Sequence, residues 1–362
     1  MTDPLTNLIT TYHELNAAVV DELHEEPSAL EFMRYVATHR PFVVRRAVSE
    51  WKACRKWDAG YLRQTMGDEE VRVAVTPSGN ADAVVERKED DTLLFVEPHE
   101  IFEPFAEFLD SVVQQSSSSS STTAAGHVKY AQTQNDNLRN EYSPLFPDVP
   151  ANIPFARIAL GQKAEAINLW LGDDRSTTAM HKDNYENLYC QIRGEKEFVL
   201  LSPGEMACVN ERVLGRGRYV PGSAAAAATS SSGDDGDDDD DTRMVGDLEV
   251  QLDVHAERVP VATWDPDEPE KHATAYSHLA KPLRVTLREG DMLYLPSMWY
   301  HKVSQRVGEE GFVCAVNYWY DMDFAGSHWA STSFVRDVYY AEQMRPQYPR
   351  LEVGEERAEG SE

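Results

Sequence analysis

The sequence predicts a mainly β fold, an antiparallel sandwich or barrel, with flanking helices. Between residues 155 and 320, short apolar runs alternate with turns at Gly and Pro, a pattern typical of antiparallel sandwiches and barrels. The runs are AINLWLG (166–172), NLYCQIRGEKEFVLLSP (187–203), LRVTLREGDMLYLPSMWYHKV (283–303) and GFVCAVNYWY (311–320). The sequence contains no phosphate loop and no G-x-G-x-x-G, so nothing in it indicates a nucleotide site.

The N-terminal part of the chain is expected to supply helices that flank these strands. Residues 5–26 place apolar side chains at helical spacing, which predicts an amphipathic helix. A second helix is predicted to begin at Ser28, and Pro41 breaks its pattern. The apolar run over 41–48 then predicts a strand.

Further along, the spacing of polar and apolar residues predicts alternating helices and strands. Asp58 is suited to cap a short helix that Gly67 ends. The alternation of valines over 71–75 predicts a half-buried strand, and residues 98–113 resemble a helix. Near the C-terminus, the pattern of residues 327–344 predicts a last helix.

Two low-complexity segments, 114–126 and 221–241, lack the apolar residues needed for burial and are predicted to be disordered surface insertions. They do not mark domain boundaries, because the sequence on both sides keeps one strand-rich character. The expected organisation has four parts: an N-terminal support region packed on the barrel (1–126), the barrel with its Asp-rich insertion (127–325), a C-terminal helix (326–350) and a mobile acidic tail (351–362).

The composition constrains the partners. The chain has 362 residues and a formal net charge of -28. Seven of the negative charges fall in one Asp-rich run, so the acidity is general. A field of this sign repels polyanions, which argues against direct binding to nucleic acid or to an anionic membrane and favours basic protein segments.

The four cysteines are far apart and include no C-x-x-C pair, which indicates neither a zinc module nor a disulfide framework. The N-terminus has early acidic residues and no uninterrupted apolar core, so we expect no signal peptide and no membrane span. The expected localisation is cytoplasmic, and a nuclear pool is compatible with it.

The first candidate for chemistry is the sequence His181-Lys182-Asp183. On an extended chain, His181 and Asp183 project to one face while the residue between them points away. One H-x-D is weak evidence, because such a pair is common in ordinary loops. A second histidine, His301, follows a predicted strand. Two histidines and one carboxylate form the facial triad that holds Fe(II) and leaves positions open, although a core histidine bonded to backbone would explain His301 alone.

The second candidate is Lys196, which shares a predicted strand face with Phe198 and Leu200. A lysine facing inward needs an anion to pair with it, and a bound dicarboxylate would serve. The alternative is that this face points outward and that Lys196 is solvated between Glu195 and Glu197.

Three neutral polar residues lie near these groups in apolar surroundings: Thr178, Asn187 and Asn317. Buried amides and hydroxyls require hydrogen-bond partners, and each of the three could merely satisfy backbone groups. Together with the triad and Lys196 they predict a pocket suited to an α-keto dicarboxylate.

On these motifs the chain resembles the JmjC family of Fe(II)- and 2-oxoglutarate-dependent oxygenases, and within it a subfamily of protein lysyl hydroxylases. The segments that carry the resemblance are NLWLGDDRSTTAMHKDNYENLYCQIRGEKEF (168–198), LREGDMLYLPSMWYHKV (287–303) and AVNYWYDM (315–322). The resemblance implies a double-stranded β-helix, the jelly-roll barrel of cupins, with Fe(II) as cofactor and 2-oxoglutarate and O2 as co-substrates.

The resemblance also implies a role for each site residue. The metal ligands would be His181, Asp183 and His301. The distal carboxylate of 2-oxoglutarate would be held by Lys196, Thr178 and Tyr130. The remaining two are a pocket amide, Asn187, and an asparagine near the metal-proximal carboxylate, Asn317.

The implied activity is C-3 hydroxylation of a lysine in a translation-associated GTPase of the developmentally regulated class, a protein substrate with a basic segment. Demethylation of N-methyl-lysine or arginine, cleavage of histone tails and metal-dependent binding without turnover are the alternatives. None of the three H-E dipeptides continues to the H-E-x-x-H of a zinc protease. The C-terminal helix could also pair two copies of the chain.

Overall fold

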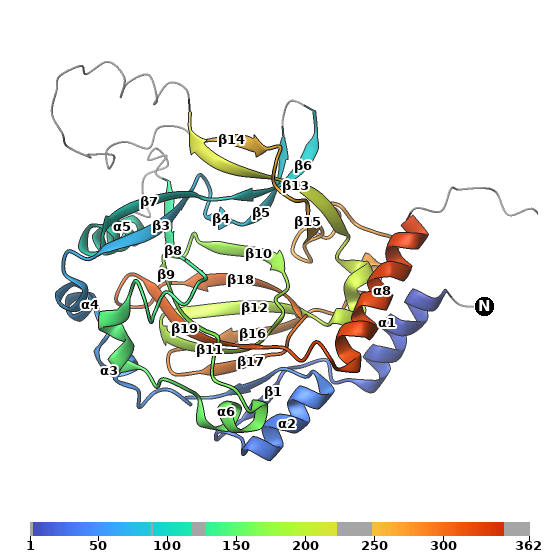
Figure 1. Cartoon of the computed structure of the whole chain (residues 1–362), viewed down its shortest axis with the longest axis horizontal. Coiled ribbons are helices and arrows are strands. Elements are labelled where there is room, and N and C mark those ends of the chain that lie inside the picture. Colours follow the sequence, from blue (N-terminus) through green and yellow to red (C-terminus); the bar gives the residue numbers. More distant parts are fainter. Residues whose placement is uncertain (1–2, 88–89, 118–126, 223–247, 344–362) are drawn as a thin grey trace, which may run out of the picture.

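The structure is a computed structural model that describes residues 3–87, 90–117, 127–222 and 248–343 (Figure 1). Its centre consists of eight strands in two facing sheets, in the orders β17-β11-β19-β9 and β16-β12-β18-β10. The strands are β9 (Ala166–Gly172), β10 (Thr177–His181), β11 (Tyr185–Arg193), β12 (Glu195–Leu201), β16 (Leu283–Leu287), β17 (Met292–Leu295), β18 (Tyr300–Arg306) and β19 (Val313–Asp321). Neighbouring strands in both groups are antiparallel.

From β9 to β12, and again from β16 to β19, each strand lies in the opposite sheet from the one before it. This alternation is the double-stranded β-helix, or jelly roll, so the predicted fold class is confirmed. Because successive strands face each other, the ends of distant segments meet between the two sheets.

The N-terminal part of the chain lengthens the first sheet at both ends, giving nine strands. At one end β17 pairs with β2 (Phe42–Val44), which pairs with β1 (Asp21–Leu23). At the other end the order continues through β8 (Val128–Ala131), β3 (Glu70–Thr76) and β7 (His99–Pro104). These segments therefore share a sheet with the barrel.

A third sheet lies above the barrel, on the side of β10 (Figure 1). Its strands are β5 (Ala83–Arg87), β6 (Thr92–Glu97), β13 (Glu211–Pro221) and β14 (Leu248–Asp253), and β15 (Val259–Ala262) pairs with β13. A two-residue strand, β4 (Asn80–Ala81), joins β10 in parallel. The predicted Asp-rich insertion falls between β13 and β14, where 223–247 lie outside the described residues.

Helices cover the outer faces of both sheets. The α-helices are α1 (Pro4–Leu15), α2 (Ala29–Thr38), α3 (Lys52–Lys56), α4 (Ala59–Met66), α5 (Phe105–Ser117), α6 (Pro154–Leu160) and α8 (Ser327–Gln343). Short 3-10 helices are η1 (Ser143–Asp148), η2 (Pro203–Cys208) and η3 (Ser277–Leu279). The largest apolar core lies between the first sheet and α2 to α6, and another lies between the second sheet and α1, η2 and α8.

Several predicted boundaries are confirmed. The Ser28 hydroxyl caps α2 by accepting from the Glu31 amide, and the Asp58 carboxylate caps α4 in the same way. Gly67 ends α4 with a φ of 56°, a conformation that glycine adopts without strain. The C-terminal helix begins at Ser327 as predicted.

The predicted bounds of two helices were wrong in part. The helix predicted over 5–26 ends at Leu15, because 21–23 pair with β2 as a parallel strand. The helix predicted over 98–113 begins only at Phe105, because residues 99–104 pair with β3. In both places, pairing with a strand from elsewhere in the chain prevails over helical spacing, as tertiary context often does.

The Ser-rich segment was predicted to be disordered from residue 114, but α5 continues to Ser117. Residues 118–126 of that segment, and the predicted acidic tail over 351–362, lie outside the described residues. Within the described ranges, no helix combines the length and the apolar character needed to cross a membrane.

Candidate active site

The three residues of the predicted metal triad meet between the two sheets. His181 is the last residue of β10 and stands directly opposite His301 on β18. Asp183 follows two residues later, and its backbone carbonyl accepts a hydrogen bond of 2.8 Å from the Met298 amide. The Asp183 carboxylate lies 3.8 Å from Nε2 of His181 and 3.6 Å from Nε2 of His301.

Backbone contacts fix the tautomer of both histidines. Nδ1 of His181 lies 2.8 Å from the carbonyl oxygen of Ala179, and Nδ1 of His301 lies 3.0 Å from that of Trp299. A carbonyl oxygen can only accept, so each Nδ1 carries a proton, and Nε2 of each ring is the nitrogen that faces the other ligands. Burial also lowers the pKa of His301 to about 4, which keeps this ring neutral at pH 7.

These atoms satisfy the requirements of an open metal site. One ligand atom from each of the three residues lies within 4.8 Å of the other two. Within the described ranges, this is the one cluster of three or more potential metal ligands. Two imidazole nitrogens and one carboxylate oxygen are the ligand set of non-haem Fe(II) oxygenases and leave coordination positions open. The donor set therefore fits Fe(II).

Lys196 lies deep in the same space and faces inward. It is 2% exposed, and its ammonium donates to the Tyr130 hydroxyl at 3.0 Å and to Oε1 of Gln305 at 2.6 Å. Burial lowers the pKa of Lys196 to about 7. Among the described residues no carboxylate forms an ion pair with it, so an anionic ligand would supply the missing counter-charge. The alternative that Lys196 is solvated is excluded.

The position of Tyr130 depends on a glycine. Tyr130 on β8 stands opposite Gly172 on β9. A Cβ atom at residue 172 would lie 2.4 Å from the Tyr130 ring, so only glycine leaves room for the ring here. The hydroxyl can then reach Lys196.

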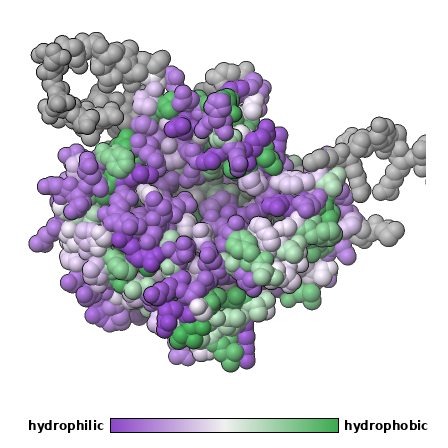
Figure 2. Space-filling model, in the orientation of Figure 1, coloured by the Kyte–Doolittle hydropathy of each residue, from purple (hydrophilic) through white to green (hydrophobic). Residues whose placement is uncertain are grey.

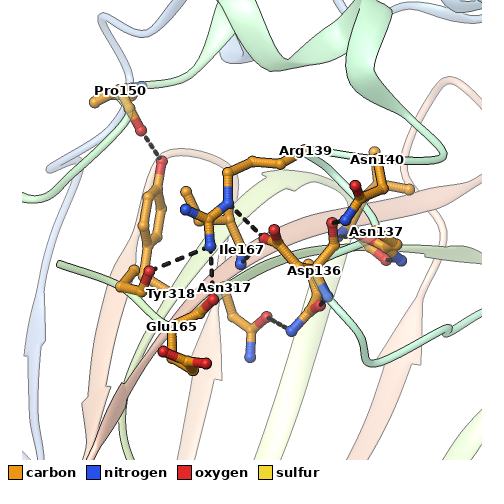
Figure 3. A network of polar contacts seen from close by, with 12 residues as sticks. Asp136, Asn137, Arg139, Asn140, Pro150, Glu165, Ile167, Asn317 and Tyr318 are labelled. Atoms are coloured by element: carbon orange, nitrogen blue, oxygen red, sulfur yellow. Dashed lines mark hydrogen bonds and ion pairs between the residues drawn. The ribbon is translucent and has the colours of Figure 1, made fainter.

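A polar network holds Asn317 in the centre of the first sheet (Figure 3). The Asp136 carboxylate accepts from the backbone amide of Ile167 at 2.9 Å, and the Asp136 amide donates to the Asn168 side chain at 3.0 Å. Asn168 in turn donates to Oδ1 of Asn317 at 3.3 Å, and the Trp170 indole donates to the same oxygen at 3.0 Å. The loop after β8 is thereby tied to the middle of β19.

All eight residues predicted for the site line one pocket: Tyr130, Thr178, His181, Asp183, Asn187, Lys196, His301 and Asn317. Asn317 donates to Oδ1 of Asn187 at 3.2 Å, and Thr178 is half-buried on β10. Trp319 also lines the pocket, and its buried indole nitrogen has no hydrogen-bond partner within the described part of the chain. The lining offers polar partners to a ligand with several oxygen atoms, with the lysine at one end of the pocket and the triad at the other.

The prediction missed two polar residues that support the pocket, Gln305 and Asn168. Gln305 bonds both Lys196 and the backbone carbonyl of Asp173. Residues 301, 303 and 305 project to the same face of β18. The rule that placed His181 and Asp183 on one face would therefore also have placed Gln305 on the face of His301.

A larger cleft of about 810 Å³ opens onto this pocket. Thr178, His181 and Gln134 line both spaces. The cleft, called here the outer cleft, continues between β10 and the third sheet, and Figure 2 shows that the molecule is hollowed beneath that sheet. A substrate side chain can approach the triad from this side.

Lys182, between two triad residues, points away from the pocket. Its ammonium pairs with the buried Glu211 carboxylate and donates to the Tyr300 hydroxyl at 2.9 Å. The Tyr300 hydroxyl donates to Glu211 at 2.7 Å, and Tyr340 of α8 donates to the other Glu211 oxygen at 2.9 Å. The C-terminal helix is therefore connected to the segment that carries His181 and Asp183.

Replacing Glu211 with glutamine is expected to lower the free energy of unfolding by about 3 kcal/mol, because the largely buried Lys182 ammonium loses its counter-charge. The affinity for Mn(II) should fall by about tenfold, because the triad segment loses its support. Urea denaturation and metal titration measure the two effects. Glu257→Gln, at an exposed position, is the control; equal unfolding free energies for the two variants would contradict the expectation.

Comparison with known proteins gives concordant matches. A profile described as "Cupin-like domain" matches residues 27–326. Two relatives align over most of both chains. "Lysine-specific demethylase JMJ32" of Arabidopsis thaliana is 35% identical over 94% of this chain and 92% of that protein. "Bifunctional peptidase and (3S)-lysyl hydroxylase JMJD7" of Homo sapiens is 36% identical over 84% of this chain and 85% of that protein.

A third relative comes from another organism. "JmjC domain-containing protein E" of Dictyostelium discoideum is 31% identical over 87% of this chain and 87% of that protein. The region that the cupin-like profile matches includes both strands that carry the candidate histidine ligands, β10 and β18.

Proposed function

The chain belongs to the JmjC family of cupin-like oxygenases, and from that premise we propose that it is an Fe(II)- and 2-oxoglutarate-dependent hydroxylase of a lysine side chain in a protein. The observation that carries the proposal is one pocket with an open ligand triad at one end and an unpaired, buried lysine at the other. This combination supplies ligands for a metal and a counter-charge for a dicarboxylate.

Each end of the pocket has a distinct task. His181, Asp183 and His301 would hold the metal through two neutral nitrogens and one carboxylate oxygen. Lys196, with the hydroxyls of Tyr130 and Thr178, would hold the distal carboxylate of 2-oxoglutarate by charge-assisted hydrogen bonds. Asn317 and Asn187 would orient the co-substrate near the triad, where their amides already bond each other.

When bound, Fe(II) and 2-oxoglutarate supply the oxidising chemistry: one atom of O2 enters a substrate C–H bond, the other enters succinate, and CO2 leaves. The chain contributes orientation and a pocket with little room for water. Trp170, Phe198 and Trp319 form apolar parts of its wall. This enclosure would keep the oxidant near the substrate carbon.

A lysine substrate is supported by the relatives and by charge. The human relative is named as a lysyl hydroxylase and peptidase, and the Arabidopsis relative as a lysine-specific demethylase. The net charge of -28 favours encounter with a basic segment. A translation-associated GTPase of the developmentally regulated class remains our proposed protein substrate.

Incubation of lysine-rich GTPase peptides with the enzyme, Fe(II) and 2-oxoglutarate is expected to add one oxygen atom per modified lysine and to form succinate in equal amount. Mass spectrometry of the peptides measures the outcome. Loss of a methyl group from methylated lysine would indicate a demethylase instead, and shorter fragments would indicate a peptidase. If no peptide stimulates succinate formation, the catalytic proposal is wrong.

A further inference from the structure

Asp82 differs from the other carboxylates of the outer cleft in its position. It lies in the turn between β4 and β5, directly after Ala81, which stands opposite Thr178 of β10. It lines the outer cleft together with His181, but it does not line the inner pocket. The carboxylate is therefore next to the passage that leads to the triad.

Three carboxylates line the outer cleft, and two of them have their own arginine. Glu97 pairs with Arg216, and Glu100 lies 3.6 Å from Arg72. The Asp82 carboxylate accepts a hydrogen bond of 3.0 Å from the neutral amide of Gln132, and in the described ranges it forms no ion pair. Asp82 is thus the carboxylate of this cleft that has no ion-pair partner among the described residues.

Partial burial makes this charge costly. Asp82 is half-buried, and desolvation raises the pKa of its carboxyl group to about 6, although the nearby His181 acts in the opposite direction. A partly buried acid without an ion-pair partner is stabilised when a cationic ligand supplies the opposite charge. Arg218 also lines the cleft, but it is exposed, so solvent screens its charge.

We propose that Asp82 binds the ammonium group of the substrate lysine and thereby selects lysine over neutral side chains of similar length. This inference rests on the proposed lysyl hydroxylation. Four bonds separate C-3 of lysine from its nitrogen, an extended distance of roughly 5 Å. An anchor in the outer cleft, outside the inner pocket, allows C-3 to face the triad while the ammonium reaches Asp82.

The same geometry distinguishes two reactions. In N-demethylation the reacting methyl carbon is bonded to the lysine nitrogen itself, so the cation must enter the inner pocket with it. In C-3 hydroxylation the cation stays several bonds away from the reacting carbon. A carboxylate that lines only the outer cleft suits the second arrangement.

The test compares the full-length protein with its Asp82→Asn variant on two peptides, one with lysine and one with norleucine at the target position. For the wild type, the KM of the lysine peptide should be about 10–100-fold lower than that of the norleucine peptide. Asp82→Asn should remove most of this preference by raising the KM for the lysine peptide alone. Glu86→Gln, which replaces an exposed carboxylate near the same turn, should change the ratio of the two KM values by less than about twofold.

Binding of 2-oxoglutarate to each preparation reports whether the inner pocket is intact, and Asp82→Ser serves if the asparagine variant does not fold. An undiminished preference for lysine in a folded Asp82 variant would overturn the anchor role while leaving hydroxylation in place. Failure of the wild type to hydroxylate any lysine peptide would instead contradict the proposed function.

Discussion

Replacing Asp183 with alanine is expected to abolish hydroxylation and the succinate formation that accompanies it. The substitution removes one of three ligands and the one negative charge among them. Loss of a residue that merely supports a metal ligand costs roughly 10–100-fold in affinity or activity, so loss of the ligand itself should exceed that range. Peptide mass spectrometry and titration with Fe(II) or Mn(II) measure the two losses.

The control is Asp174→Ala, which removes an exposed carboxylate from the connection between β9 and β10. This variant should keep both metal affinity and activity. Circular dichroism of Asp183→Ala should match the wild type, because the half-buried Asp183 side chain accepts no hydrogen bond from the described residues. Oxygen addition by Asp183→Ala at the wild-type rate would contradict the assigned triad.

Alternation along strands explains why much of the pocket could be predicted. His181 and Asp183 are two residues apart, and Lys196 shares its inward face with Phe198 and Leu200. That periodicity is local and visible in the sequence. It does not say which segment faces which, so the pairing of His181 with His301 followed from the family resemblance.

The errors have a different physical cause. Residues 21–23 and 99–104 become strands because β2 and β3 offer them pairing partners, and their own sequences do not contain that information. Asp82 was missed for a related reason. It sits in a turn, and only the pairing of β4 with β10 brings it close to the strand that ends at His181. Its importance depends on which charges remain unpaired in the folded chain.

Replacing Lys196 with methionine is expected to weaken 2-oxoglutarate binding by about 100- to 1,000-fold, because a carboxylate would be buried without its cation. Isothermal titration in the presence of Mn(II) measures the affinity. Binding of Mn(II) itself should change little, since Lys196 is not among the clustered ligands. Lys163→Met, at an exposed position, is the control.

The Lys196→Met variant should not unfold at a lower temperature than the wild type, although it loses the hydrogen bonds to Tyr130 and Gln305. Burial lowers the pKa of Lys196 from its usual 10.5 to about 7 in the folded chain. The unfolded chain therefore binds more protons between these values, so stability without ligand rises with pH in that window. Methionine removes this cost at neutral pH.

The lowered pKa of Lys196 also makes co-substrate binding dependent on pH. Lys196 must be protonated to pair with a carboxylate, and without ligand it loses its proton as the pH rises through about 7. The affinity for 2-oxoglutarate should therefore fall between about pH 7 and pH 9, by at most tenfold per unit. Burial keeps His301 neutral throughout this range. Lys196→Met should lose the pH dependence, whereas a wild-type affinity that is constant over the range would show that Lys196 stays charged without its ligand.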